Sequence, residues 1–325
     1  MKKQSETRSV TQLFLLICLV SVAQWPGRAE AACSQIHLAN MDPVEWRGAS
    51  GGRYDAFDAS QYVQAVEIRV RKTGGGSCRY AIGISEGYSG TFEPRQMKRR
   101  GEKLAYNLHN SAAQTNVLMD LALGGSVIEG AFTNSEADLE ANTHTYYWII
   151  PPMQVVSGAN SWYQDRLTFR LHEELGGVFV QRHSGTKHHR ARASQMVEVS
   201  LVDVGAPFNS ADISQQLDFG VFSAGQSLSF DLRARGNTSF DVSLQSVNAG
   251  VMAHASLPSA VPYTLEVDGV PVDLTSGAEV PIASFSGDAT GANGVGYRVA
   301  VTVGSLSGTL GGLHRDSITV TVAAQ

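Results

Sequence analysis

Short runs of alternating apolar and polar residues recur along this chain. They include Val66-Glu67-Ile68-Arg69-Val70-Arg71 and Phe240-Asp241-Val242-Ser243-Leu244, and turns rich in Gly, Asn and Ser separate them. Alternation with a period of two places one face of a strand on a core and the other face in water. Long runs with the 3.6-residue period of a helix are missing. The pattern therefore predicts an all-β protein of the sandwich type.

Four segments of the chain occur twice, in the same order. The last pair shares the pattern Asp, any residue, apolar, Thr, apolar, any residue, apolar. Such a repeat predicts two related domains, over residues 32–205 and 206–325, because a strand-like run ends and Pro interrupts near Gly205-Ala206-Pro207. The paired segments are Val66–Arg71 with Phe230–Arg235, Tyr80–Ser85 with Phe240–Gln245, Tyr147–Ile150 with Tyr297–Ala300, and Asp165–Leu171 with Asp316–Val322.

The two domains differ in the length of chain beyond the Asp motif. After the first copy the chain reaches another alternating run, in which Val197, Val199 and Leu201 share one face. After the second copy it ends at Gln325. We expect the run at 196–202 to complete the first sandwich and the second sandwich to lack its final strand. A complete second domain with fewer strands is the alternative.

The first 31 residues have the pattern of a secretory signal peptide. Lys2, Lys3 and Arg8 precede an apolar run from Leu13 to Ala23, and Ala29-Glu30-Ala31 fits a small-x-small cleavage site. The run is too short to span a membrane. This segment holds four basic and two acidic residues, so its removal changes the formal net charge from −5 to −7. An exported, acidic chain argues against nucleic acid as a partner.

Cleavage there would leave two cysteines, Cys33 and Cys78. In an exported protein such a pair is expected to form a disulfide, and two free thiols are the alternative. The bridge would close a loop of about 45 residues and contribute roughly 4 kcal/mol in the chain-entropy model.

The polar residues indicate no catalytic centre. Gly83-Ile84-Ser85-Glu86-Gly87 fits the nucleophile-elbow pattern, but no helical pattern comes after it, so we predict no enzyme and expect no cofactor. His183, His188 and His189 lie in the basic stretch 176–194, which we interpret as a solvated hairpin tip. A contact with an anionic polymer or surface is the alternative. Adjacent histidines on a strand point to opposite faces, so we expect no metal.

Several aromatic residues stand next to Gly, Ser or Asn, where loops are expected. Exposed aromatics on loops can anchor an adhesive contact, and we expect this of Trp46, Tyr88 and Phe92. Trp162 and Tyr163 are weaker candidates, and Tyr163 could serve instead as a corner tyrosine before Asp165. Ordinary core packing is the alternative for all of them.

Motifs along the chain resemble the spore coat protein U family, which includes subunits of archaic chaperone–usher pili. The resemblance covers nearly all of residues 32–325, although the second domain lacks the family's cysteines. The first domain carries it in Cys78-Arg79-Tyr80, Ser85-Glu86-Gly87, Arg95-Gln96-Met97, Leu104–Leu108 and Tyr163–Thr168, and the second in Leu217–Gly220, Tyr263–Leu265 and Asp316–Val320.

This resemblance implies two immunoglobulin-like β-sandwiches, the second of which receives its missing strand from another protein. The donors would be a periplasmic chaperone and then the adjacent pilus subunit, assembled at an outer-membrane usher. The residues expected to line the donor-strand cleft are Phe219, Phe222, Ile318, Val320 and Val322. The alternative is that these are core residues of a complete domain.

After the expected cleavage only Ala32 precedes Cys33, which leaves no room for a donor segment. The resemblance then implies a tip adhesin on a cell-surface pilus, which would attach to an abiotic or host surface and promote biofilm formation. The alternative is a structural coat protein or minor shaft subunit without adhesive activity.

Overall fold

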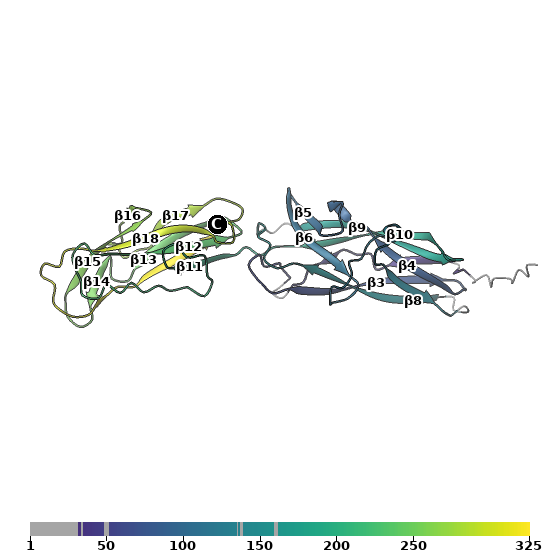
Figure 1. Ribbon diagram of the computed structural model, residues 1–325, viewed down its shortest axis with the longest axis horizontal. Helices are drawn as coiled ribbons and strands as arrows, with labels where there is room; N and C mark the ends of the chain where they lie inside the picture. The colour runs from purple at the N-terminus through teal and green to yellow at the C-terminus, as the bar shows by residue number, and fades with distance from the viewer. Residues whose placement is uncertain (1–31, 34, 49–51, 135, 137–138, 159–161) are drawn as a thin grey trace, which may run out of the picture.

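The computed structural model describes residues 32–33, 35–48, 52–134, 136, 139–158 and 162–325, so the expected signal peptide lies outside the described residues. These residues form strands and two short 3-10 helices, η1 (Gly87–Ser89) and η2 (Leu121–Leu123), which confirms the all-β prediction. Figure 1 shows two lobes placed end to end, with β1–β10 in the first and β11–β20 in the second. Within the described residues, no helix is long and apolar enough to cross a membrane.

The first lobe is one continuous sheet of ten strands folded into two layers, because β6 pairs with β8 in one layer and with β5 in the other. The order along the sheet is β1-β3-β8-β6-β5-β9-β10-β2, and β4 joins β7 to β9. The strands are β1 (Gln35–Ala39), β2 (Val44–Glu45), β3 (Tyr62–Thr73), β4 (Cys78–Ile84), β5 (Arg95–Arg99), β6 (Glu102–His109), β7 (Ile128–Phe132), β8 (Leu139–Ile150), β9 (Tyr163–Leu175) and β10 (Val178–Ala191).

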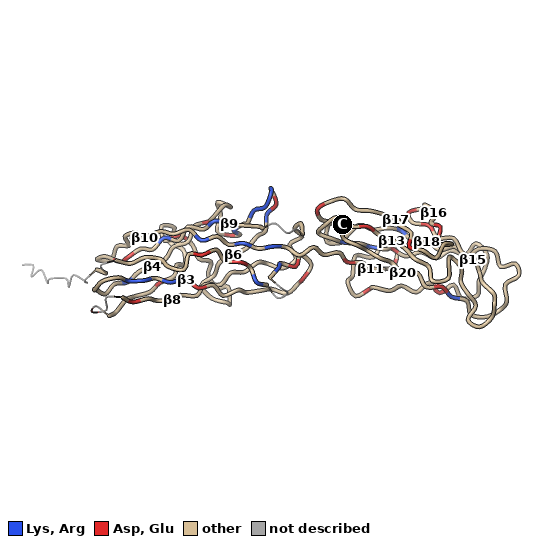
Figure 2. Tube along the Cα trace, turned by 180° about the vertical axis from the view of Figure 1, so that it is seen from behind, with Lys and Arg blue, Asp and Glu red and all other residues tan. Residues whose placement is uncertain are grey.

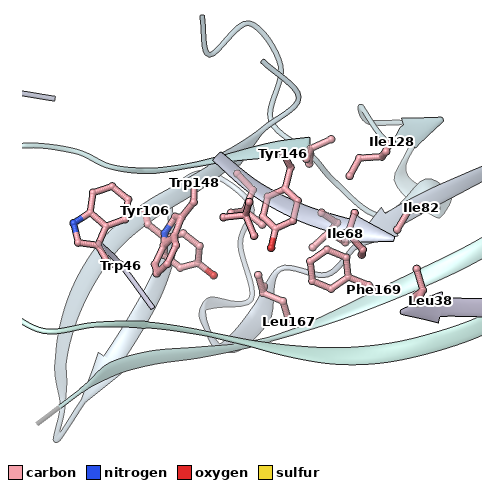
Figure 3. Packing of buried hydrophobic residues seen from close by; sticks show 14 of the residues in the cluster. Leu38, Trp46, Ile68, Ile82, Tyr106, Ile128, Tyr146, Trp148, Leu167 and Phe169 are labelled. Atoms are coloured by element: carbon pink, nitrogen blue, oxygen red, sulfur yellow. The ribbon is translucent and has the colours of Figure 1, made fainter. Parts of the chain in front are cut away.

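The alternating pattern of the sequence places the core of this lobe between its layers. Along β3, Val66, Ile68 and Val70 are buried and the residues between them are exposed. Aromatic side chains fill one end of the core, where Trp148 lies edge-on to Trp46 with ring centroids 5.1 Å apart (Figure 3). Trp148 is fully buried, so it is a core residue.

The second lobe packs a seven-stranded sheet, ordered β11-β12-β18-β15-β14-β19 with β16 beside β15, against a three-stranded sheet, β17-β13-β20. In β15 every second residue is buried, which gives this sheet its apolar inner face. The strands are β11 (Val197–Val202), β12 (Ser227–Gly236), β13 (Phe240–Ser246), β14 (Val251–His254), β15 (Ala260–Val267), β16 (Val270–Val272), β17 (Val280–Phe285), β18 (Val295–Val303), β19 (His314–Arg315) and β20 (Ile318–Ala324).

The repeat in the sequence returns as equivalent strands with equivalent pairing. β3 pairs with β8 and β12 with β18, and the Asp motif opens both β9 and β20. Both aspartates are held alike. Tyr106 Oη donates to Asp165 Oδ2 at 2.6 Å and Tyr263 Oη donates to Asp316 Oδ2 at 2.6 Å. The other oxygen of each carboxylate accepts the N–H of the next residue, Arg166 or Ser317.

One expectation about the strand at 196–202 is wrong. This run forms β11, but β11 pairs antiparallel with β12, with Leu201 opposite Leu232, and so extends the sheet of the second lobe. Val197, Val199 and Leu201 pack on the second core instead of the first. The alternating pattern identified a strand with one buried face, but it carries no information about which of two similar cores that face covers.

The interpretation of residues 176–194 as a solvated hairpin tip is also wrong. This stretch contains the whole of β10, a strand of 14 residues that pairs with β9 from end to end. Lys187 and His189 are buried, and Lys187 Nζ donates to the backbone oxygen of Asn40 at 2.6 Å. β10 therefore supplies the final strand that the first lobe was expected to contain.

Candidate strand-acceptor site

The strand that carries the Asp motif is paired on both edges in the first lobe and on one edge in the second. β9 pairs with β4 and β5 on one edge and with β10 on the other. Its counterpart β20 pairs with β13, the counterpart of β4, and no strand in the described residues pairs with its other edge. The second lobe therefore has an open edge at the place where β10 lies in the first.

Burial of the equivalent side chains reflects this difference. In β9, Leu167, Phe169 and Leu171 are fully buried. Their counterparts in β20, namely Ile318, Val320 and Val322, face the second core but are only half-buried. Equivalent apolar positions thus remain in contact with water where the additional strand is absent.

The open edge of β20 presents backbone groups as well as side chains. The N–H of Gln325 donates to Ser239 O, and the N–H of Val247 donates to Ser317 O, both at 2.9 Å. Bonded residues alternate along an antiparallel pair, so the odd-numbered residues of β20 bond to β13. The N–H and C=O groups of the even-numbered residues, including Val320 and Val322, point to the open edge.

The opposite side of this edge is formed by β11. β11 and β20 approach each other on the same side of the lobe (Figure 2). Val197, Val199 and Leu201 of β11 are half-buried and pack on the same core as the three apolar residues of β20. We did not predict these three residues for the site, because their alternating pattern was assigned to the first sandwich.

Phe219 and Phe222 lie in the segment before β12. Phe219 is buried, and the Phe222 ring is half-buried, 6.2 Å from the ring of Phe219 and 6.0 Å from that of His314. His314 opens β19, just ahead of β20. Phe222 thus lies beside a residue of the segment that leads into β20, and Phe219 packs on Phe222. The part of both rings in strand binding stays a prediction.

The three aromatic residues expected to be adhesive are not gathered on one surface. Trp46 is 3% exposed and belongs to the core, so the expectation of an exposed Trp46 is wrong. Its burial results from the pairing of the adjacent β2 with β10. Phe92 is half-buried under the guanidinium of Arg95, 4.9 Å from the ring. Tyr88, in η1, is the one that is exposed, at 47%.

The weaker aromatic candidates have structural partners. Tyr163 is fully buried, and its hydroxyl donates to Ser157 O at 3.0 Å, six residues upstream, as in a corner tyrosine. The ring of Trp162 is half-buried and stacks with the guanidinium of Arg192 at 3.9 Å.

A set of exposed apolar side chains that we did not predict lies at the end of the first lobe remote from the second. β10 begins there with Val178 and Val180, which are 64% and 40% exposed, and β8 begins there with Leu139, which is 70% exposed. The register of β1, β3 and β8 brings Leu139 beside Thr73. Leu139 lies in one layer and Val178 and Val180 lie in the other, and we call these three exposed residues at one end of the lobe the distal apolar patch. The two-glycine turn ahead of Val178 is the sequence signal that could have located it.

The disulfide expected between Cys33 and Cys78 is formed, with Cα atoms 5.5 Å apart. It lies at the same end of the lobe as the distal apolar patch. Cys78 is the first residue of β4, and Tyr80, two residues later, lies opposite Glu173, close to the turn from β9 into β10. Beside it, the buried carboxylate of Glu173 accepts the N–H of Cys33 at 2.9 Å and Nε of Arg182 at 2.6 Å.

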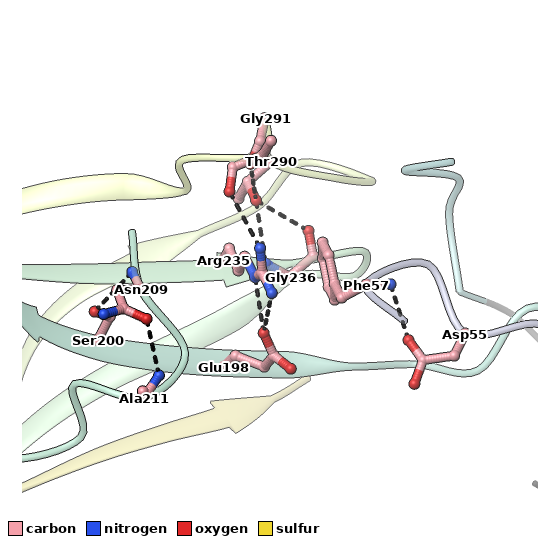
Figure 4. A network of polar contacts seen from close by, with 11 residues as sticks. Asp55, Phe57, Glu198, Ser200, Asn209, Ala211, Arg235, Gly236, Thr290 and Gly291 are labelled. Carbon is pink, nitrogen blue, oxygen red and sulfur yellow. Dashed lines mark hydrogen bonds and ion pairs between the residues drawn. The ribbon is translucent and has the colours of Figure 1, made fainter. Parts of the chain in front are cut away.

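The junction between the lobes is centred on Asn237, which is fully buried. Its side chain donates to Ser194 O at 2.7 Å and Val156 O at 3.1 Å and accepts the N–H of Met196 at 2.8 Å. Next to it Arg235 pairs with Glu198 at 2.6 Å and lies over the ring of Phe57 in the first lobe (Figure 4). These contacts connect the start of β11 to both lobes.

Comparison with known proteins supports part of the resemblance found in the sequence. Residues 47–170, which include β3 to β8 and the first half of β9, match the Spore Coat Protein U domain. The resemblance is thereby confirmed for these residues. No curated protein matches the chain.

Solved structures with a similar course of the chain include two from pilus systems. One is a chain of the CsuC–CsuE chaperone–tip adhesion subunit pre-assembly complex from archaic chaperone–usher Csu pili of Acinetobacter baumannii, at 14% identity and TM-score 0.43, with 81% of this chain and 91% of that chain covered. The other is the CupB6 tip adhesin from Pseudomonas aeruginosa, at 11% identity and TM-score 0.37, with 90% and 94% covered.

Proposed function

We propose that this protein is the tip subunit of an archaic chaperone–usher pilus and that its second lobe is completed by a strand from another protein. The observation that carries the proposal is the open edge of β20 at the position that β10 fills in the first lobe. On this proposal the second domain begins before Val197, since β11 pairs within it. The chain would be exported, with a chaperone, the usher and the next subunit as partners.

The energetics favour completion by strand addition. An added strand would bond to the free N–H and C=O groups of β20 and place alternate side chains on the half-buried residues of β11 and β20. Four apolar donor side chains would contribute roughly 6–12 kcal/mol at about 1.5–3 kcal/mol each. The whole stability of a domain is about 5–15 kcal/mol. We therefore expect the stability of the second lobe to depend on a bound donor strand. Without a donor, the unpaired edge of β20 would promote aggregation.

The first lobe provides the template for a test. Its β9–β10 hairpin turns at Gly176-Gly177, so the same Gly-Gly turn followed by a strand of alternating apolar residues can be fused after Gln325. We expect this fusion to be monomeric and to unfold at higher denaturant concentration than the parent. A fusion with Asp at the alternating positions is the control. Equal stability and equal solution state of all three proteins would contradict the proposal.

The proposed attachment role belongs to the first lobe. Its edge beside β9 is already filled by β10, so the lobe needs no neighbour and is suited to stand at the end of a fibre. The distal apolar patch lies at its outer end, where contact with a host or abiotic surface would bury Leu139, Val178 and Val180. Biofilm formation would result from such contact.

A deletion strain separates this role from that of a minor shaft or coat protein. When the deletion strain carries the gene for the Leu139→Ser, Val178→Ser, Val180→Ser variant, we expect pili to assemble normally and attachment to be lost. The wild-type gene should restore attachment. Leu123→Ser, at an exposed apolar residue of η2 outside the patch, is the control. Pili that attach normally with the triple variant would favour the alternative function.

A further inference from the structure

A cavity of about 950 Å³ lies on the flank of the first lobe, apart from the open edge and from the distal apolar patch. It is bounded by β2, by described residues on either side of β2, by residues 64–67 of β3, by Trp162, and by Lys187 and Arg192 at the end of β10. Its volume lies in the range of ligand sites, about 300–1,000 Å³.

Two tryptophans far apart in the sequence both line this cavity. Trp162 is half-buried and stacked with Arg192, whose guanidinium carbon lies 3.9 Å from the ring centroid. Trp46 forms part of the wall from below, where it is anchored on Trp148. An aromatic ring among mainly polar and charged side chains suits a ligand that has both an apolar face and many hydrogen-bonding groups.

The cavity is lined by four basic and three acidic side chains. Arg47, Arg53 and Arg192 line it together with Asp42, Glu45 and Glu67, while the fourth basic residue, Lys187, is buried and bonded to Asn40 O. Basic and acidic residues are likewise interspersed over the lobe (Figure 2). Guanidinium groups only donate and carboxylates only accept hydrogen bonds, whereas a hydroxyl does both. A ligand rich in hydroxyls and without net charge uses both kinds of group, whereas for a polyanion the attraction of the arginines would be offset by repulsion from the carboxylates.

The wall of the cavity is held in place by backbone contacts. The N–H of Arg47 donates to Gln64 Oε1 at 2.8 Å, and Gln64 Nε2 donates to Glu45 O at 2.9 Å. The N–H of Trp46 donates to Arg190 O at 2.8 Å, and β2 pairs in parallel with β10. Because these bonds fix the backbone on both sides, little ordering entropy would be lost on binding.

We propose that this cavity is a binding site for a neutral oligosaccharide, with Trp162 as the apolar contact for the sugar ring and with Glu45, Asp42 and the arginines as hydroxyl partners. The site depends on neither strand addition nor the distal apolar patch, so it is a second recognition surface beyond the proposed function.

The test is binding of the purified full chain to an array of neutral and acidic oligosaccharides, followed by titration of the best neutral one. We expect Trp162→Ala and Glu45→Gln each to weaken binding by roughly tenfold, the equivalent of about 1.4 kcal/mol. Glu45 is exposed, and it accepts the hydrogen bond from Gln64 through its backbone oxygen, so that variant leaves the fold intact. Glu129→Gln, the same charge change at an exposed residue outside the cavity, is the matched control and should bind normally.

Three outcomes would overturn the inference: no binding to any neutral oligosaccharide, binding to acidic ones alone, or equal affinity of the parent and both cavity variants. The result is independent of the attachment assay. A chain that binds no sugar while its deletion strain loses attachment would refute this site and leave the proposed function standing.

Discussion

At the scale of single residues, the first lobe keeps a histidine neutral inside its core. His189 is fully buried, its Nε2 lies 3.0 Å from Tyr146 Oη, and its ring lies edge-on to Trp148. Burial, with the nearby charges of Lys187, Arg95 and His188, lowers the pKa of His189 to about 3. Adjacent His188 is half-buried on the other face of β10. The strand therefore separates two histidines that the sequence places side by side.

This burial predicts an acid-sensitive first lobe. An unfolded histidine has a pKa of about 6.5, so between that pH and pH 3 the unfolded chain binds a proton that the folded chain does not. His189 should thus reduce the free energy of unfolding by about 1.4 kcal/mol per pH unit as pH falls from 6.5. His189→Gln should remove that component and His188→Gln should not.

The measurement is denaturant unfolding at several pH values, followed by tryptophan fluorescence. Trp46, Trp148 and Trp162 all belong to the first lobe, so the signal reports that lobe alone in the chain beyond residue 31. A slope with pH that is equal in the parent and in His189→Gln would show that His189 is not the titrating group.

Removal of the Cys33–Cys78 disulfide gives a second prediction at the scale of residues. Replacing Cys33 and Cys78 together by Ser should lower the free energy of unfolding of the first lobe by about 4 kcal/mol, because the open chain regains the entropy of the closed loop. The same fluorescence titration measures this change. A loss below about 1 kcal/mol would mean that the bridge constrains the unfolded chain little.

At the scale of strands, alternation was enough to predict the all-β class, and the repeated segments form equivalent strands. It was not enough to identify β10 as a strand or to assign β11 to the correct lobe. Each has one face suited to a core, and pairing is decided by distant partners. The hairpin into β10 did have a local signal, the Gly176-Gly177 pair with both φ values positive, but the polar residues around His183 concealed the strand.

The sequence likewise predicted only part of the strand-acceptor site. Ile318, Val320 and Val322 could be located from the repeated motif, and their half-burial matches the prediction of a strand without its neighbour. The three residues of β11 could not be predicted for the site without knowing the pairing of β11 with β12. Trp46 was misjudged because the nearby Gly48 indicates a loop but not which residues cover the Trp46 side chain.

The strand-acceptor site makes a prediction for β20. Val320→Asp places a carboxylate at the half-buried position facing the core, whereas Thr321→Asp places it on the exposed face. In the chain with a donor strand fused after Gln325, we expect Val320→Asp to lose roughly 3 kcal/mol or more of the donor's stabilisation, since the charge would be buried unpaired. Thr321→Asp should retain it. Equal losses in the two variants would argue that no strand covers this face.

At the scale of the whole molecule, the two lobes are joined at a packed contact. Asn237 links the lobes through two backbone oxygens and one N–H, and Arg235 adds an ion pair and a contact with Phe57. A fixed junction would hold the distal apolar patch at the far end of the molecule from the second lobe. It also connects the start of β11, and hence the strand-acceptor site, to the first lobe.

This junction can be tested by removing its central side chain. Asn237→Ala would leave backbone groups of Ser194, Val156 and Met196 without their hydrogen-bond partner. Each unsatisfied group would lower the free energy of unfolding by about 1–3 kcal/mol. We expect a wider distribution of distances between the lobes in small-angle X-ray scattering. Asn248→Ala, which removes a bond to Arg315 within the second lobe, is the control. Identical scattering from the parent and Asn237→Ala would show that other contacts set the arrangement.

The central claim is that one edge of β20 is unpaired and accepts a donor strand. Hydrogen exchange of the backbone amides of β20 tests this claim most directly. In the full chain without donor, the amides of Thr319 and Thr321, which face β13, should exchange slowly, while those of Val320 and Val322 should exchange quickly. Addition of the donor strand should slow exchange at Val320 and Val322 and leave Thr319 and Thr321 little changed. Equal protection of all four amides before the donor is added, or no change at Val320 and Val322 afterwards, would contradict the account.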